Sequence, residues 1–215
     1  MYIDFHVHSI FSDGIFPPEV IVKHASRKVN GLAFTDHIGS KDYLSVLNKR
    51  FRIYGGIERD DFIVIPGVEF SIDIGHVVVL FPNFEINFPN LIVSDISSLH
   101  EIVDMFGGVT VAAHIFRSSG VGERIYDFKR FFDAVEVYPF TNDFDVFSLK
   151  IPLIAGSDSH TFWTIGFAST FIYEYSCSID NILNSIICGR IIPVFNKPYI
   201  LRKLLDTPHM IRLLI

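Results

Sequence analysis

Short apolar segments alternate with longer amphipathic segments along nearly the whole chain, and this alternation restricts the fold more than any other feature of the sequence. Strands are expected at residues 2–7, 31–35, 62–70, 76–81, 109–113, 134–137, 152–155 and 168–173. Helices are expected at 17–30, 41–51, 95–107, 124–131, 143–149 and 178–188. Because crossover helices join parallel strands, the alternation predicts an α/β protein with a parallel sheet.

The number of expected strands favours a closed or nearly closed β/α barrel. A doubly wound open sheet is the alternative, but the sequence contains neither a G-x-G-x-x-G string nor a P-loop to support nucleotide binding of that type. No internal repeat, low-complexity tract or linker interrupts the 215 residues. We therefore expect a single domain, residues 1–215.

Composition excludes several classes of protein. Apolar residues make up 49% of the chain, too many for a disordered tail, and apolar runs such as residues 77–81 are too short to span a bilayer. The N-terminal segment does not resemble a signal peptide, so we expect a cytoplasmic protein that does not bind membranes. The net charge of -6 argues against a protein that coats long nucleic acid, although bound divalent cations can reverse the potential locally.

Histidines and acidic residues gather at the C-terminal ends of the expected strands. In a β/α barrel these ends face one mouth, so residues far apart in the sequence converge there. His76 opens a strand instead, while His24 and His100 fall within helices and His209 near the end of the chain, where packing or surface roles are expected. The residues at strand ends are His6, His8, Asp13, His37, Glu69, His114, Asp158 and His160.

The spacing of these residues indicates metal binding. His6 and His8 stand two apart on an extended segment, so both imidazoles point to one face, and Asp158 and His160 repeat this spacing. Glu69 lies in an apolar strand, where a buried carboxylate needs a cation or a hydrogen-bond network. Any one of these residues alone could be a hydrogen-bonded core histidine or a turn aspartate.

As an ordered set, these motifs resemble the PHP superfamily, the polymerase and histidinol phosphatase domains, over residues 3 to about 175. The resemblance implies a distorted (β/α)7 barrel of the PHP type that holds up to three divalent metal ions and hydrolyses phosphoester bonds. Zn, Mn and Fe suit such a mixture of imidazole and carboxylate about equally. The motifs are His6-x-His8, Ser12-Asp13-Gly14, Thr35-Asp36-His37, Pro66-Gly67-Val68-Glu69 with His76, Ala112-Ala113-His114 and Gly156-Ser157-Asp158-Ser159-His160.

Carried over position by position, the resemblance implies three ligand sets. The first ion would be held by His6, His8, Glu69 and Asp158. The second would be held by Glu69, His76 and His114, and the third by Asp13, His37 and His160. The sequence departs from the family in having Ile115 after His114, where members often have proline, and it is too short for the large insertion that covers the site in some small relatives.

The expected function is hydrolysis of a small phosphorylated metabolite or a short oligonucleotide by a phosphatase or phosphodiesterase. Two ions bridged by Glu69 can lower the pKa of a shared water and orient the resulting hydroxide toward phosphorus, which gives Glu69 and Asp158 catalytic roles. Arg117 either clamps a phosphoryl oxygen or pairs with Glu123 or another acid. The reaction, the metal, the substrate and the oligomeric state are not fixed by the sequence.

The alternative is a non-catalytic PHP-like scaffold resembling the archaeal ribonuclease P protein subunit. The complete set of candidate ligands and the acidic composition count against it, because a subunit that only binds RNA needs basic surface and no open metal sites.

Overall fold

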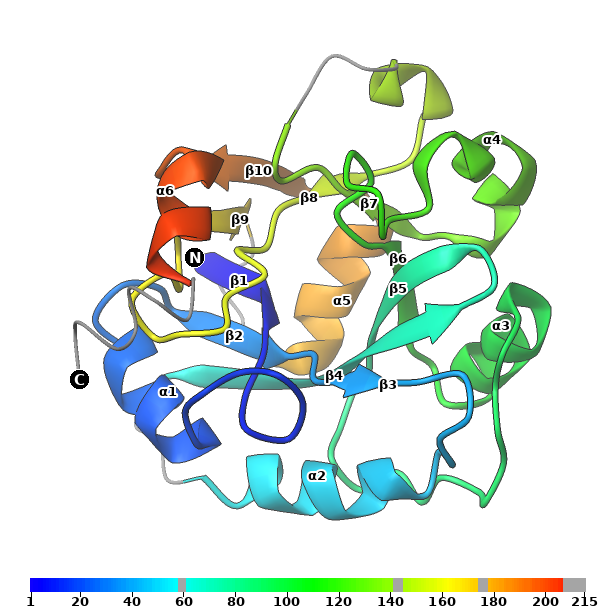
Figure 1. Ribbon diagram of the computed structural model, residues 1–215, viewed down its shortest axis with the longest axis horizontal. Coiled ribbons are helices and arrows are strands. Elements are labelled where there is room, and N and C mark those ends of the chain that lie inside the picture. Colours follow the sequence, from blue (N-terminus) through cyan, green and yellow to red (C-terminus); the bar gives the residue numbers. More distant parts are fainter. Residues whose placement is uncertain (58–60, 141–144, 174–177, 207–215) are drawn as a thin grey trace.

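The described residues form ten strands of one curved sheet whose edges approach each other, as the computed structural model shows (Figure 1). The structure describes residues 1–57, 61–140, 145–173 and 178–206. The strands are β1 (Tyr2–Val7), β2 (Gly31–Phe34), β3 (His37–Ile38), β4 (Ile63–Ile72), β5 (Gly75–Leu80), β6 (Val109–Ala112), β7 (Ala134–Glu136), β8 (Leu153–Ile154), β9 (Ala168–Ile172) and β10 (Ile191–Phe195).

Helices connect most of these strands. The α-helices are α1 (Pro18–Ala25), α2 (Val46–Gly55), α3 (Ile96–Met105), α4 (Ile125–Phe128), α5 (Ile179–Ile187) and α6 (Tyr199–Leu205), with 3-10 segments η1 (Gly122–Arg124), η2 (Lys129–Phe131) and η3 (Val146–Leu149). Asp95 and Ser178 cap α3 and α5, since each side chain accepts a backbone N–H of the first turn of its helix. Among the described helices, none has the length and apolar character to cross a membrane.

The order of the strands forms a nearly closed barrel. The sheet runs β10-β9-β1-β2-β4-β5-β6-β7-β8, with β3 beside β4, and β8 and β10 lie in contact. Its wall is the run of seven strands from β1 and β2 through β4 to β8. At the mouth, the segment after β8 closes onto β1, because Val7 and Ser159 form a parallel bridge. The expected distorted seven-stranded α/β barrel is therefore confirmed.

The expectation of parallel pairing throughout was wrong for three strands. β5 is antiparallel to β4, because the turn between them reverses the chain within a few residues, and it is also antiparallel to β6, which follows after α3. Gly75 has φ +122° in this turn, a conformation that L side chains rarely adopt. Likewise β9 pairs antiparallel with β1 and with β10.

Several other elements differ from expectation. The sequence reading did not anticipate β3, β10 or α6, and the helix expected at 41–51 begins only at Val46. Of the helix expected at 143–149, residues 146–149 form η3 and residues 143–144 lie outside the described residues.

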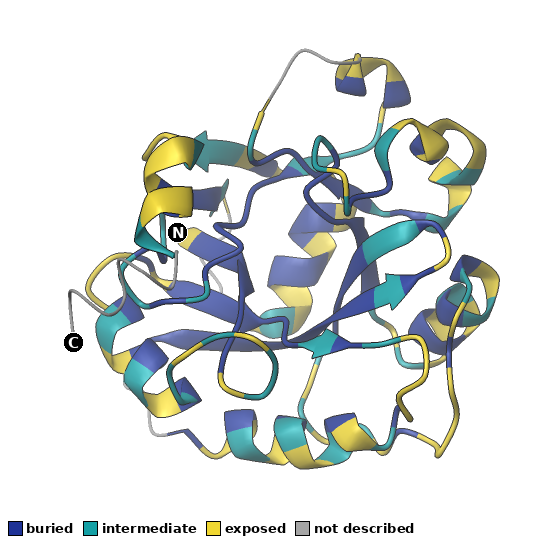
Figure 2. Ribbon diagram, viewed as in Figure 1, coloured by how far each residue is buried: buried dark blue, intermediate teal, exposed yellow. Residues whose placement is uncertain are grey.

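Two apolar cores lie on the two faces of the barrel wall, whose strands are almost entirely buried (Figure 2). The larger core joins α1, α2 and α3 to one face of the sheet. The smaller core joins the other face to α5, which appears within the ring of strands in Figure 1 and contributes Ile182 and Ile186. Since side chains alternate along a strand, Ile63 and Ile65 of β4 share their face with Glu69. The same face thus carries apolar residues at one end and polar residues at the other.

Candidate metal centre

The nine residues expected to bind metal come together at one end of the barrel. His6, His8, His114, Asp158 and His160 stand at or just after the C-terminal ends of β1, β6 and β8. Glu69, His37 and His76 lie on β4, β3 and β5, and Asp13 lies in the loop that follows β1.

The histidines assigned to other roles lie apart from this group. His24 stacks on Phe162, with ring centroids 4.0 Å apart, and His100 pairs with Asp104 one turn along α3. His209 lies outside the described residues.

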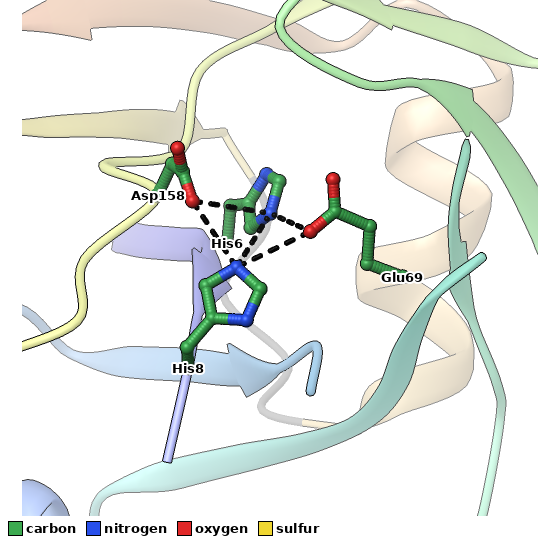
Figure 3. A group of neighbouring side chains, drawn as sticks. All are labelled: His6, His8, Glu69 and Asp158. Carbon is green, nitrogen blue, oxygen red and sulfur yellow. Dashed lines mark hydrogen bonds and ion pairs between the residues drawn. The ribbon is translucent and has the colours of Figure 1, made fainter. Parts of the chain in front are cut away.

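Four buried side chains form the tightest group, and Figure 3 shows them pointing toward one another. The Nε2 atom of His8 lies 3.2 Å from Glu69 Oε2 and 3.1 Å from Asp158 Oδ1. The Nε2 atom of His6 lies 3.0 Å from Glu69 Oε2 and 3.6 Å from Asp158 Oδ1. One donor atom from each residue lies within 4.8 Å of every other, the geometry of four ligands around one cation.

Glu69 is the centre of the whole arrangement, because its two oxygens face different imidazoles. Oε2 faces His6 and His8 and also lies 3.3 Å from His37 Nδ1. Oε1 lies 2.9 Å from His76 Nδ1 and 3.0 Å from His114 Nε2. A carboxylate with separate ligand neighbours on each oxygen has the geometry needed to bridge two ions.

The outer residues divide somewhat differently from the sets implied by the resemblance. His37 groups with Glu69 and His76, and its Nε2 also lies 3.7 Å from Asp13. His8 groups with Asp13 and His160, whose Nε2 lies 3.0 Å from Asp13 Oδ2. His37 thus lies between His76 and Asp13, and His8 belongs both to the four buried side chains and to the group of Asp13 and His160.

The donor atoms are arranged as ligands of divalent ions, because hydrogen bonds among them do not satisfy all of them. His37 Nδ1 and His76 Nδ1 are buried and close to Glu69 oxygens, yet neither makes a hydrogen bond within the described part of the chain. The Nε2 atoms of His6 and His8 face each other at 3.1 Å, and two neutral imidazoles can do so only where one supplies a proton. Lone pairs that converge in this way are typical of ligands to a shared cation.

The buried carboxylates dominate the electrostatics of the site and attract positive charge to it. Burial alone would lower the pKa of His8, but hydrogen bonds and charges from Asp158 and Glu69 raise it to about 9. Burial would raise the pKa of Glu69, yet the surrounding histidines hold it well below its usual range. Burial lowers the pKa of His37 to about 4, against the charge of Glu69, which leaves its imidazole neutral near pH 7. The site therefore concentrates positive charge around buried carboxylates.

Glu136 is a functional residue that the sequence reading missed. Its Oε2 lies 2.9 Å from His6 Nδ1 and accepts the backbone N–H of His114 at 2.8 Å. A carboxylate on Nδ1 keeps the proton there and leaves Nε2 free as a ligand atom. The signal was present, since Glu136 is a lone acid in an apolar strand, as Glu69 is.

Asp4 is a second buried acid that was not expected from the sequence. It holds the loop that carries Asp158. Its carboxylate accepts the N–H of Ser157 at 2.8 Å, the hydroxyl of Ser157 at 2.6 Å and the N–H of Gly166 at 2.8 Å. Burial raises the pKa of Asp4 to about 6. The loop needs this support because Asp158 has φ +50°, an uncommon conformation for a residue other than glycine.

Two arginines reach Asp158. Arg117 forms an ion pair with Asp158 Oδ2, so in this structure its partner is an acid, as one of its two sequence interpretations anticipated. Its side chain keeps 28% of its surface exposed, which leaves it accessible from the mouth. Arg202 of α6 also contacts Asp158, and no local pattern in the sequence pointed to it.

Comparisons with known proteins agree with this architecture. A family model described as PHP-associated matches residues 148–191. An uncharacterized protein of Methanocaldococcus jannaschii, MJ1295, is 35% identical over 74 residues, which are 33% of this chain and 34% of that protein. The match therefore spans only about a third of the length of that curated relative.

Solved structures resemble nearly the whole chain. PsfC from Pseudomonas syringae has a TM-score of 0.76 at 20% identity, over 99% of this chain and 98% of that one. A two-domain protein containing a predicted PHP-like metal-dependent phosphoesterase, from Bacteroides vulgatus, has a TM-score of 0.70 at 21% identity, over 91% of this chain and 64% of that one. The lesion-specific endonuclease PfuEndoQ from Pyrococcus furiosus has a TM-score of 0.62 at 16% identity, over 89% and 57%.

Fold and donor set together define a PHP-type barrel with a candidate metal centre at its mouth. The chain thus has the fold of PHP-like proteins, and residues 148–191 match the PHP-associated family model. The buried His, Glu and Asp groups at its mouth could hold metal ions.

Proposed function

We propose that the protein is a metal-dependent phosphoesterase that acts on a small phosphorylated metabolite or a short oligonucleotide. The observation that carries the proposal is Glu69, a fully buried carboxylate whose two oxygens lie within 3.3 Å of five imidazole nitrogens. Up to three divalent ions, Zn, Mn or Fe, would be held by the nine residues and would supply Lewis-acid activation of water and neutralisation of phosphoryl charge.

The chain's own residues would prepare the site for this reaction. Glu136 holds the proton of His6 on Nδ1, so that Nε2 is presented to the centre. Asp158 presents Oδ1 to the imidazoles while its other oxygen is held by arginine. Arg117 would leave this ion pair to bind a non-bridging phosphoryl oxygen with its planar fork of N–H groups.

An open cavity of about 770 Å³ begins at His76 and offers space for the leaving group. Serines line much of it, including Ser71, Ser118 and Ser119, and Arg124 stands at its edge. Arg124 donates to the backbone oxygens of Val121, Asp73 and Gly120. Asp73 and Asp95 line the cavity as well, so it suits a polar leaving group better than an apolar one.

Charge counts against the scaffold alternative and against long nucleic acid. Five of the nine candidate ligands, His6, His8, Glu69, His114 and Asp158, are buried, and burying such groups without a ligand is costly in a protein that only binds RNA. The chain carries 18 basic and 24 acidic residues, so attraction of an anion would depend on the bound ions.

Removal of metal is expected to abolish hydrolysis of a generic aryl phosphate ester. After chelation and dialysis, Mn²⁺ or Zn²⁺ should restore the rate, because the proposed function assigns the activation of water to the bound ions. The measurement is the rate of product release together with metal analysis of the purified protein. Hydrolysis that persists after rigorous metal removal contradicts the proposal.

Short substrates are expected to be preferred over long ones, the opposite of what a processive nuclease would show. A substrate held mainly at the mouth should give a KM with a shallow dependence on salt, because few phosphates meet basic side chains. The comparison is hydrolysis of a mononucleotide, a pentanucleotide and a long single strand over a range of salt concentrations. A steep salt dependence together with the best rate on the long strand would overturn this substrate assignment.

A further inference from the structure

Helix α6 packs on the barrel through Tyr199 at its first turn, but farther along it buries a charged residue and leaves apolar residues exposed. Ile200, Leu201 and Leu204 are 63%, 38% and 53% exposed, whereas Arg202 is only 5% exposed. Helices at protein surfaces ordinarily bury their apolar residues, and arginine is seldom buried unless it is paired. The buried position of Arg202 therefore requires a specific set of partners.

The partners of Arg202 belong to the metal centre and its supporting loop. Its Nη2 atom lies 3.0 Å from Asp158 Oδ2 and 3.1 Å from His160 Nδ1. Its Nε atom forms an ion pair with Asp206 Oδ2 at 3.0 Å. Asp206 in turn accepts hydrogen bonds from Thr161 and Thr164, at 2.9 and 2.8 Å, in the loop just beyond His160. Arg202 thus contacts two proposed ligands and is itself held by a carboxylate anchored beside them.

The two oxygens of Asp158 have separate surroundings. Oδ1 faces the imidazoles, 3.1 Å from His8 Nε2 and 3.6 Å from His6 Nε2, while Oδ2 faces the guanidinium groups. A carboxylate fixed by one oxygen can offer only the other to an ion, in a defined direction. The backbone of Asp158 is left-handed, at φ +50°, an uncommon conformation that surrounding contacts must maintain.

We propose that Arg202 is a positioning residue of the metal centre, which holds Asp158 so that Oδ1 is presented to the ion. The proposal rests on the metal centre of the proposed function. It also explains why two arginines meet one oxygen. The Arg117 side chain is 28% exposed and free to turn toward a phosphoryl oxygen, whereas that of Arg202 is 6% exposed and keeps Oδ2 paired when Arg117 leaves.

The test is Co²⁺ titration of the metal-free, full-length protein, followed by visible absorption as well as by binding. Arg202→Ala is expected to weaken the binding of the Co²⁺ ion nearest Asp158 by about 10- to 100-fold, the range found for residues that orient ligands. It should also change the absorption spectrum of that ion. Arg202→Lys should recover part of the affinity, since an ammonium keeps the charge but cannot span Asp158, His160 and Asp206 together. Lys203→Ala removes the same charge from an exposed neighbour on α6 and should bind Co²⁺ as the wild type does.

A purely structural role for Arg202 predicts a different pattern. In that case Arg202→Ala lowers the thermal midpoint but leaves Co²⁺ affinity and spectrum unchanged, and this result overturns the proposal. If Arg202→Ala does not fold, Asp206→Asn and Arg202→Lys provide the test, because both retain a cation on α6. Both should weaken Co²⁺ binding. If both bind Co²⁺ as the wild type does, the proposal is overturned. The two proposals can fail separately. If Co²⁺ binding depends on Arg202 but the protein hydrolyses no phosphoester, the positioning role is supported and the proposed function is refuted. If the wild type binds no Co²⁺, both are refuted.

Discussion

Replacing Glu69 with Gln is expected to lower phosphoester hydrolysis by more than about 100-fold, beyond the effect of losing a residue that only orients a ligand. Gln has the same shape, but it loses the negative charge and one of the two oxygens. In the structure those oxygens separately face His6, His8 and His37 on one side and His76 and His114 on the other. The substitution therefore disturbs both halves of the centre at once.

His37→Ala is the matched comparison for Glu69→Gln. The side chain of His37 is 27% exposed and approaches the cluster from its edge, so its removal should cost less activity than the loss of a bridging carboxylate. Rates with saturating metal and metal content after dialysis should be measured for both variants. Equal losses, or a larger loss for His37→Ala, would contradict the central position assigned to Glu69.

Gly156→Ala is expected to damage the centre without touching any ligand atom. A Cβ at this position would lie 2.5 Å from His6 Cβ and 2.6 Å from Glu136 Oε1, closer than real Cβ contacts. The methyl group must push His6 away from Glu136 or displace the loop that carries Asp158. We expect a loss of about 1–3 kcal/mol in the free energy of unfolding, as is usual when a well-packed interior is overfilled, together with reduced metal binding.

The control for this substitution is Gly56→Ala at the end of α2. There a Cβ would lie 3.4 Å from the nearest atom, the backbone oxygen of Arg52, which is an ordinary contact. Denaturant unfolding and Co²⁺ titration of both variants separate the effects on fold and on site. A Gly156→Ala protein as stable and as metal-competent as Gly56→Ala would show that the approach of β1 to this loop tolerates an added methyl group.

The sequence predicted where polar residues would converge because strand ends in a β/α barrel share one mouth, a rule that needs no side-chain detail. His6 and Glu69 could be found this way, and the structure places them 3.0 Å apart. Glu136 and Asp4 satisfy the same argument from buried charge that identified Glu69, but neither lies in one of the motifs that the sequence shows. Their role appears only once their hydrogen-bond partners, far along the chain, are known.

The direction of β5 shows where the general rule of alternation failed. The rule predicted a parallel sheet, but β4 ends at Ile72 and β5 begins at Gly75, and so short a connection joins antiparallel strands. Arg202 illustrates a different limit, since nothing near it in the sequence indicates that its partner is Asp158.

The closure of the barrel by the segment after β8 has a consequence for how the protein is made. The contacts that complete the centre join residues 130 positions apart, for His6 and Glu136, and 153 positions apart, for Asp4 and Ser157. Contacts of such long sequence separation form late, since the entropy of closing the intervening loop must be overcome first. On the ribosome, the histidines of β1 emerge long before Asp158 and Arg202. A nascent chain therefore offers an ion only part of the donor set, and full coordination marks the end of folding instead of guiding its beginning.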